Sequence, residues 1–412
     1  MWEFNYGEWT EAYVFLRLLG NGRIYAANER FQRNENVYMD IIDIIRYEKK
    51  QLLRFERCIE EAVVYASENR TRFKILAFSE LTEKAEFLYG AIKNITSATG
   101  KFSVPEIEAY LKELKFSQPK APPMPPLVAK QFGNKTDIIF SFEDSADHSK
   151  STTGFSVKSH LGSSPTLFNS ATSSNLIYEV EGCTDDIMDE INGNQIDSET
   201  GIFQYIRDDS DLTLKYVGTS EKFQANLDFV ELTMADILNC AVLVQIGYYP
   251  GAKSKSTKDI IEKISELNPI GVRRPETWYK AKMKDFLFAS FSGLTATDPW
   301  DGRRMLSGGY IDVNTAGEIL YYRAISDDIF SSYLFENTFF DRPSRGVNKN
   351  IAKIVAKAHL KGREPTEEEL NKVTYKYENG RLTKYPKKGD WGYVYKENDR
   401  YYITINFQIR FR

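Results

Sequence analysis

The pattern of apolar and polar positions along the chain switches repeatedly between the spacing of helices and that of strands. Apolar residues three or four positions apart, as in an amphipathic helix, predict helices over residues 8–19, 82–95, 105–114, 184–192, 231–242 and 257–267. Apolar runs and alternation with a period of two predict strands over residues 40–45, 73–78, 136–142, 154–159, 175–180, 309–313, 318–325 and 401–412. Because both element types recur throughout, we expect an α/β or α+β fold.

A proline-rich stretch, residues 119–126, interrupts this pattern. Proline fits neither a helix interior nor a central strand, so the stretch predicts an extended connector. We therefore expect four parts: an N-terminal helix with an α/β region (1–118), the connector (119–135), a core that includes the strand at 175–180 (136–270), and a basic C-terminal region (271–412). Within the last part, residues 346–395 are expected to be an insertion.

The predicted strands at 136–142 and 154–159 form a hairpin whose two faces differ in chemistry. One face is apolar and carries Ile138, Phe140, Phe142, Phe155 and Val157. The other carries Asp137 on the first strand and Ser156 and Lys158 on the second, so a carboxylate and an ammonium would project side by side. An acid that holds a cation, next to a lysine that activates water and offsets phosphate charge, predicts metal-dependent phosphodiester cleavage.

This order of residues resembles the motif of PD-(D/E)xK nucleases, with Ser156 in the position of the second acid. Because a hydroxyl binds Mg²⁺ far more weakly than a carboxylate, we expect another acid to complete the metal site with Asp137. Related nucleases often supply a glutamate from a helix packed on the sheet, and Glu11 lies among apolar residues in the first predicted helix. The alternative is that Glu11 is only an acid favoured by the helix N-terminus, with Glu143 or Asp144 as the second ligand.

Several polar residues beyond the hairpin are candidates for DNA contacts. His160 would share the face of Lys158, where it would contact phosphate, act as a base or serve only as a hydrogen-bonded spacer. Hydroxyl and amide groups that commonly bind phosphate and sugar follow at Ser163, Thr166 and Asn169. Side chains suited to reading bases occur in the basic C-terminal region at Arg303, Arg304, Gln408 and Arg410. A solvated strand face and a plain turn would give the same patterns.

Three blocks of the sequence resemble the HpaII-type family of restriction endonucleases. The longest covers residues 159–171, directly after Lys158, and the others cover residues 7–11 and 405–411. They lie in family order and span almost the whole chain. The resemblance implies a Type II restriction endonuclease with a PD-(D/E)xK-like core, a mixed sheet flanked by helices, and β-rich DNA-binding parts near both ends of the chain.

The resemblance also implies a cofactor and partners. These are Mg²⁺, double-stranded DNA as substrate, and a cognate DNA methyltransferase as a functional partner. The type enzyme of the family reads CCGG, so a CCGG-containing site is the default expectation. A palindromic target favours a homodimer, and monomers that nick each strand in turn are the alternative. Two other functions stay open: a DNA-binding protein without cleavage, because one acid of the motif is missing, and a repair or junction nuclease that recognises DNA shape.

The composition indicates a cellular compartment, and it shows that charged residues are distributed unevenly along the chain. The 412-residue chain is 42% hydrophobic and 14% aromatic, which predicts a folded globular protein, and no apolar run is long enough for a membrane span. Its cysteines, Cys58, Cys183 and Cys240, are far apart, so we expect reduced thiols in a prokaryotic cytoplasm. The net charge is −4, and residues 251–412 hold 29 Lys and Arg against 21 Asp and Glu, which leaves 25 against 37 in residues 1–250. An acidic metal-binding part and a basic DNA-binding part are consistent with a nuclease.

Overall fold

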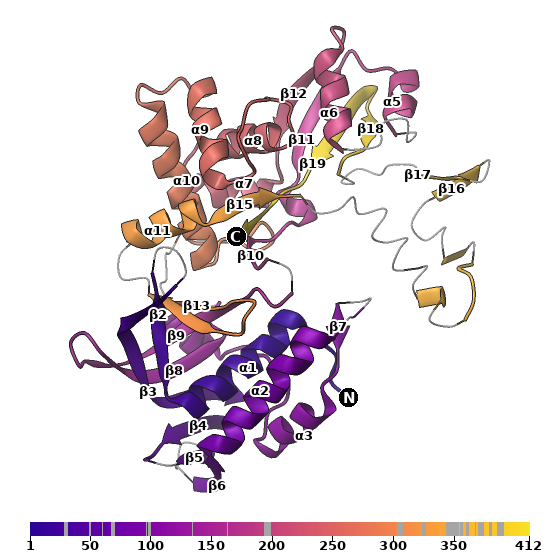
Figure 1. The fold of residues 1–412 in the computed structure, drawn as a ribbon. Helices are drawn as coiled ribbons and strands as arrows, with labels where there is room; N and C mark the ends of the chain where they lie inside the picture. Colours follow the sequence, from indigo (N-terminus) through magenta and orange to yellow (C-terminus); the bar gives the residue numbers. More distant parts are fainter. Residues whose placement is uncertain are drawn as a thin grey trace. The chain divides into compact units, whose positions relative to one another are not determined.

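A computed structural model gives the fold of the chain (Figure 1). It describes residues 1–28, 32–48, 51–59, 61–66, 71–95, 97, 100–133, 135–162, 164–192, 199–302, 308–323, 327–342 and 391–412, with shorter pieces between 354 and 384. None of the helices in these ranges is both long enough and apolar enough to cross a membrane.

The chain forms two compact units, each assembled from two stretches of sequence. The first unit comprises Met1–Pro165 and Arg304–Phe330, and the second comprises Thr166–Arg303 and Ser331–Arg412. These limits differ from the expected divisions after residues 118 and 270, because the chain returns to the first unit at residue 304. In the C-terminal third of the chain, segments that follow one another in the sequence therefore belong to different units.

A nine-stranded sheet is the framework of the first unit, with strand order β2-β14-β13-β9-β8-β3-β4-β5-β6. The strands are β2 (Arg23–Ala27), β3 (Arg33–Glu48), β4 (Gln51–Arg57), β5 (Glu61–Ala66), β6 (Thr71–Ala77), β8 (Ile138–Asp144), β9 (Lys150–Ser159), β13 (Gly309–Val313) and β14 (Ile319–Arg323). The pairs β13–β9 and β14–β2 are parallel and the other neighbours are antiparallel. The sheet is therefore mixed, as the family resemblance implies.

Helices cover one face of this sheet (Figure 1). They are α1 (Tyr6–Asn21), which packs on β3 and β9, α2 (Phe78–Asn94), which lies beside α1, and α3 (Pro105–Glu113). Helix α1 begins with a capping box between Asn5 and Glu8 and ends at Gly22, whose φ of 75° favours glycine. The core between helices and sheet includes Trp9, Leu16, Leu88, Phe140 and Phe155. The remaining elements are the short pair β1 (Phe4–Asn5) with β7 (Lys101–Phe102) and the helix α4 (Pro126–Phe132).

The second unit contains two smaller sheets. One has the order β12-β11-β19-β18 and the other the order β10-β20-β15. Their strands are β10 (Thr166–Phe168), β11 (Leu176–Glu181), β12 (Thr213–Gly218), β15 (Thr338–Asp341), β18 (Val394–Glu397), β19 (Arg400–Ile405) and β20 (Gln408–Phe411). Stacked rings of Phe168, Phe223 and Phe407 form part of the core.

Helices make up most of the rest of this part of the chain. They are the 3-10 turn η1 (Thr172–Ser174) and the helices α5 (Asp185–Asn192), α6 (Glu199–Asp208), α7 (Glu221–Asp228), α8 (Met234–Gln245), α9 (Thr257–Leu267), α10 (Pro275–Ser292) and α11 (Asp327–Glu336). A separate hairpin joins β16 (Tyr375–Glu378) to β17 (Arg381–Lys384).

Most predicted elements are present, and two predictions are wrong. Helices occur at all six predicted places, as α1, α2, α3, α5, α8 and α9. The strand predicted at 175–180 exists as β11, but it belongs to a sheet of the second unit and not to the sheet that carries the hairpin. The single strand predicted at 401–412 is two strands in different sheets, because the buried Asn406 turns inward and donates to Asn175 Oδ1 at 2.5 Å.

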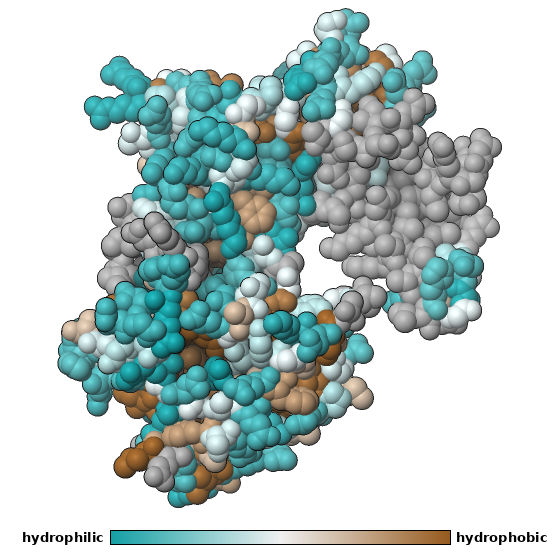
Figure 2. All heavy atoms as spheres, in the orientation of Figure 1, coloured by the Kyte–Doolittle hydropathy of each residue, from teal (hydrophilic) through white to brown (hydrophobic). Residues whose placement is uncertain are grey.

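Hydrophilic residues cover most of the face drawn in Figure 2, and hydrophobic residues form small groups among them. The large hydrophobic side chains that are exposed among the described residues include Ile59, Leu127, Phe229 and Leu232. Scattered apolar residues of this kind are normal on a protein surface, so this distribution does not by itself indicate a binding site.

Candidate active site

Asp137 lies directly before β8, where the predicted hairpin begins. Its backbone N–H donates to the carbonyl of Phe155 at 2.9 Å, and its Oδ2 accepts from the Val157 N–H at 2.7 Å and the Ser156 hydroxyl at 3.1 Å. The close approach depends on Gly154, since a Cβ there would collide with Thr136. Ser156, which the sequence analysis placed at the position of the second acid of the motif, therefore helps to fix the carboxylate of Asp137.

Lys158 follows on β9, two residues after Ser156 and partly buried. Burial lowers the pKa of its ammonium, while the nearby carboxylates of Asp137 and Glu11 act in the opposite direction. The pKa of Asp137 is raised by burial, and Lys158 is the first of the groups that oppose this rise. The predicted acid and lysine are thus brought together, close enough to influence each other's protonation.

Glu11 reaches the same place from helix α1. The helix is tied to β9 beside the site, because the hydroxyls of Thr10 and Ser159 share a hydrogen bond of 2.8 Å. Burial raises the pKa of Glu11 well above its ordinary value, and the charge of Asp137 is the next cause. The structure therefore gathers Glu11, Asp137 and Lys158, which the sequence singled out from three separate segments.

The pair of carboxylates suits a hard divalent cation in its donor chemistry. Each acid has one oxygen fixed by a backbone N–H, from Val157 for Asp137 and from Ala121 for Glu11. Repulsion from Asp137 raises the pKa of Glu11, and a bound cation would relieve this repulsion. The described residues contain no group of three or more His, Cys, Asp or Glu side chains able to hold a metal, but Mg²⁺ commonly uses one or two carboxylates, with water and phosphate oxygens as its other ligands.

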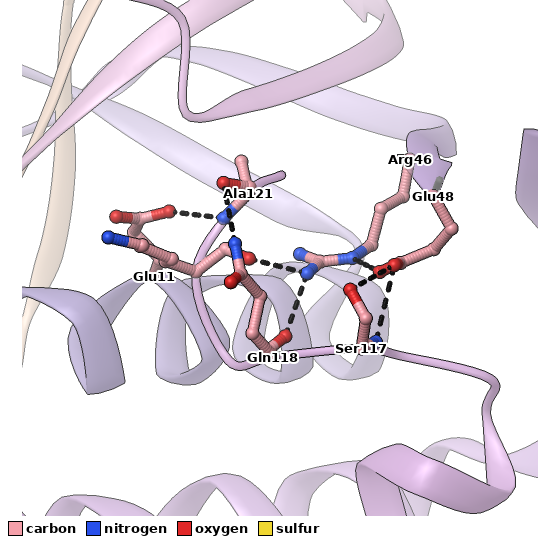
Figure 3. A network of polar contacts seen from close by, with 7 residues as sticks. Glu11, Arg46, Glu48, Ser117, Gln118 and Ala121 are labelled. Atoms are coloured by element: carbon pink, nitrogen blue, oxygen red, sulfur yellow. Dashed lines mark hydrogen bonds and ion pairs between the residues drawn. The ribbon is translucent and has the colours of Figure 1, made fainter. Parts of the chain in front are cut away.

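Residues 117–121, which we call the strap, hold Glu11 in position (Figure 3). The Ala121 N–H donates to Glu11 Oε2 at 2.7 Å. The buried Arg46 of β3 fixes the strap by donating to the carbonyls of Gln118 at 2.8 Å and Lys120 at 2.6 Å. At its start, the Ser117 hydroxyl and N–H both donate to Glu48, which is paired with Arg46 at 2.7 Å. The beginning of the proline-rich connector is therefore part of the site.

Lys135 is a further charged group that the sequence reasoning missed. The pKa of its ammonium is lowered to about 8, by burial first and by the positive charge of Lys158 second, while Asp137 opposes both effects. Lys135 lies in a turn two residues before Asp137, so the alternation that marks the faces of a strand does not reach it. A lone lysine in a turn gives no pattern that marks it from sequence.

His160 and the alternative acids have partners of their own. His160 Nε2 lies 2.9 Å from Oδ1 of the buried Asp312, which is the residue paired with Lys158 across the β13–β9 ladder. The interpretation of His160 as a hydrogen-bonded spacer agrees with this contact. Glu143 and Asp144 lie at the far end of β8, roughly 20 Å along the strand from Asp137 at about 3.3 Å per residue, and they pair with Lys150 and Arg323, respectively.

Three of the predicted DNA-binding residues, Thr166, Gln408 and Arg410, lie on the β10-β20-β15 sheet. Thr166 starts β10, and Asn169 is exposed just after that strand. Gln408 and Arg410 lie on β20, where both donate to Asp341. The others, Ser163, Arg303 and Arg304, lie outside the described residues, so their roles stay predictions.

Comparison with known proteins shows which family this chain resembles over most of its length. The model of the HpaII restriction endonuclease family matches residues 5–351, a range that includes Glu11, Asp137 and Lys158. The chain is also similar to the Type II restriction enzyme HpaII of Haemophilus parainfluenzae, with 28% identity over 412 aligned residues that cover 99% of this chain and 98% of the relative. No solved structure gives a significant match.

Replacing Glu11 by Gln should stabilise the protein in the absence of divalent metal. The pKa of Glu11 is raised in the folded protein, which means that ionisation of Glu11 disfavours the folded state. In the unfolded chain a glutamate has a pKa of about 4.3. As far as Glu11 is concerned, the protein is therefore most stable below that pH and loses stability as the pH rises toward the higher pKa of the folded state. The difference in melting temperature between E11Q and the wild type, measured in chelator, should therefore grow with pH. Glu8→Gln is the control, because Glu8 is paired with Lys120 at 2.5 Å. A melting temperature for E11Q that falls at every pH would contradict the assignment.

Replacing Arg46 by Met should release the strap. The variant leaves two carbonyls and the buried Glu48 without their partner, and the loss of one partner from a buried pair typically costs about 3–5 kcal/mol. Hydrogen exchange at the Ala121 amide should accelerate far more than exchange in β4. Arg54→Met is the matched control, since Arg54 pairs with Asp43 at 2.7 Å on the neighbouring strand. Equal protection of the Ala121 amide in both variants would show that Arg46 does not hold the strap.

Proposed function

Because this chain belongs to the HpaII restriction endonuclease family, we propose that it cuts duplex DNA through Mg²⁺ bound by Asp137 and Glu11, with Lys158 as the catalytic cation. Family membership makes the chain a Type II site-specific deoxyribonuclease. The observation that carries the assignment of residues is the meeting of Glu11, Asp137 and Lys158 at one end of the hairpin, with Glu11 and Asp137 close enough to affect the protonation of Lys158.

The two acids would hold the metal ion through their carboxylate oxygens. When bound, Mg²⁺ supplies Lewis-acid polarisation of the phosphate and of the attacking water. The residues of the chain provide the fixed geometry, because Asp137 is held by Val157 and Ser156, and Glu11 by Ala121. Such preorganisation means that the ligands need little rearrangement when charge develops at the phosphorus.

Lys158 would act on the water or on the phosphate. Its ammonium lies beside Asp137, where it can orient the attacking water or offset the negative charge that accumulates on the phosphate oxygens. Burial lowers the pKa of Lys158, which makes its proton easier to exchange. This role needs a fixed position of the lysine. Strand β9 supplies that position, because its backbone is held between β8 and β13.

The proposed core is a PD-(D/E)xK-like arrangement of β8, β9, β13 and α1. In this proposal Glu11 replaces the second acid of the motif, and Ser156 keeps a supporting role as donor to Asp137. The proposed target is a short site that contains CCGG, as the family resemblance implies. A cognate methyltransferase, a cytoplasmic location and a homodimer on a palindromic site complete the proposal.

Lys158→Ala should abolish cleavage while leaving sequence-specific binding largely intact. Loss of a preorganised charge at the transition state typically costs at least about 10²–10³-fold in rate. The measurement is digestion of unmethylated plasmid in Mg²⁺, alongside binding of the same site in Ca²⁺. Lys150→Ala is the matched control, because Lys150 lies at the other end of β9, is 70% exposed and pairs with Glu143 at 3.7 Å.

The outcomes of this digestion separate the candidate functions. A K158A enzyme that cuts at the wild-type rate would remove Lys158 from the mechanism. A wild-type protein that binds DNA specifically but never cuts it would be a DNA-binding protein without cleavage. Cleavage without discrete fragments would indicate a nuclease that recognises DNA shape.

A further inference from the structure

We propose that the outer face of the β10-β20-β15 sheet is a base-reading surface that recognises G·C pairs in the major groove of the DNA. This inference rests on the proposed function, and it names the part of the chain that would select the site. The residues of the face are Thr166, Phe339, Asp341, Gln408 and Arg410, all partly exposed. Three of them were singled out from the sequence, and the sheet adds Phe339 and Asp341.

The register of the sheet places these side chains on one face. Arg410 is paired with Thr166 of β10 and with Phe339 of β15, and Gln408 is paired with Asp341. Residues paired directly across antiparallel strands project to the same side. Alternate residues of one strand also share a side, so Gln408 and Arg410 belong to the same face. The five side chains therefore form one continuous surface.

The opposite face of the sheet is buried, which makes the reading face rigid. Ile409 and Phe340, which are paired with each other, are fully buried, and Phe411 is nearly so. The Thr338 hydroxyl shares a hydrogen bond of 2.8 Å with Thr257, at the start of α9. Recognition needs side chains held within a fraction of an ångström on fixed elements, and this packing provides such a base.

Asp341 orients the two longest polar side chains of the face. Its Oδ2 accepts from Gln408 Nε2 at 2.8 Å and from Arg410 Nη1 at 3.1 Å. Its other oxygen, Oδ1, accepts no hydrogen bond from the described residues. Arginine bonds bidentately to guanine, and an aspartate accepts from the amino group of cytosine, so Arg410 with Oδ1 of Asp341 offers the two groups that distinguish a G·C pair.

The spacing of the face matches the spacing of bases. Residues i and i+2 of a strand are about 6.6 Å apart, and base pairs are stacked about 3.4 Å apart. Gln408 and Arg410 would therefore reach base pairs about two steps apart. A two-stranded or three-stranded ribbon of this kind is one of the ways in which proteins enter a major groove.

Lysines border the face and would contact the phosphate backbone. Segment 253–258 runs along the free side of β15, since Ser256 bridges to Phe339 and the Phe340 N–H donates to the Lys255 carbonyl at 3.0 Å. The lysines of this segment, Lys253, Lys255 and Lys258, are exposed. Lys255 forms no ion pair with any residue that the structure describes. Base readers flanked by cations give the charge complementarity that a DNA duplex requires.

Removing one hydrogen-bond acceptor from the DNA tests the role of Arg410. Guanines of the recognition site are replaced one at a time by 7-deazaguanine, which lacks the N7 acceptor. For the wild type, one replacement should slow cleavage by about 10- to 100-fold, as expected for a lost base contact. Arg410→Lys keeps the charge and the pairing with Asp341 but lacks the bidentate fork, so it should cut the normal site slowly and show no further loss at that guanine.

Two variants serve as controls. Arg400→Lys should respond to every 7-deazaguanine as the wild type does, because Arg400 is an exposed arginine of β19 that pairs with Glu179 at 3.4 Å. Lys255→Ala should weaken binding of cognate and non-cognate DNA alike and reduce the salt dependence by about one counterion.

Asp341 is a positioning residue. Its role is tested by the ratio of the cleavage rates on two DNA sites that differ at one base pair, and not by the cleavage rate on one site alone. Asp341→Asn should cut the proposed G·C site and a site with A·T at that pair at more similar rates, with an unchanged melting temperature. If 7-deazaguanine slows cleavage by R410K and by the wild type by the same factor at every guanine, the proposal of a base-reading surface is wrong. If the wild type produces no discrete fragments at all, the proposed function itself fails, so the two failures are distinguishable.

Discussion

The repulsion between the carboxylates of Glu11 and Asp137 is the constraint that the contacts of the candidate site have to overcome. The two acids come from segments more than a hundred residues apart, and the charge of Asp137 contributes to raising the pKa of Glu11. A fold that brings like charges together in a partly buried place loses free energy unless something offsets it. Lys158 offsets part of the repulsion, and a divalent cation would offset more of it, which is why we propose that the two acids bind a metal ion.

The architecture around the two acids keeps them in place against this repulsion. Asp137 is fixed from β9 by a backbone N–H and a hydroxyl, and Glu11 is fixed from the strap by the Ala121 N–H. The strap is itself fixed by the buried Arg46, which belongs to a strand of the same sheet. Helix α1 adds a third attachment, through Thr10 and Ser159. Each contact is local, but together they tie the site to the centre of the nine-stranded sheet.

Local patterns in the sequence predicted the parts of this site that depend on local geometry. Alternation placed Asp137 and Lys158 on neighbouring strands, and helical spacing placed Glu11 on α1. Long-range pairing could not be predicted in this way. Nothing at residues 309–313 shows that this strand pairs with β9 in parallel and brings Asp312 to His160, and nothing at 175–180 shows which sheet the strand joins. The break at Asn406 depends on polar partners some 230 residues away, and the strap depends on Arg46, which looks like an ordinary strand residue.

Mapping the metal by iron-mediated cleavage of the polypeptide tests the shared site most directly. With added hydrogen peroxide as oxidant and ascorbate to reduce the iron again, Fe²⁺ bound in place of Mg²⁺ generates hydroxyl radicals that cut the backbone only near the ion. Cuts are expected near residues 11, 121, 137 and 158, four points far apart in the sequence, and they should disappear with excess Mg²⁺ or in Asp137→Asn. Cuts confined to other segments, or cuts near residue 137 without any near residue 11, would contradict the account in which Glu11 and Asp137 bind one metal ion.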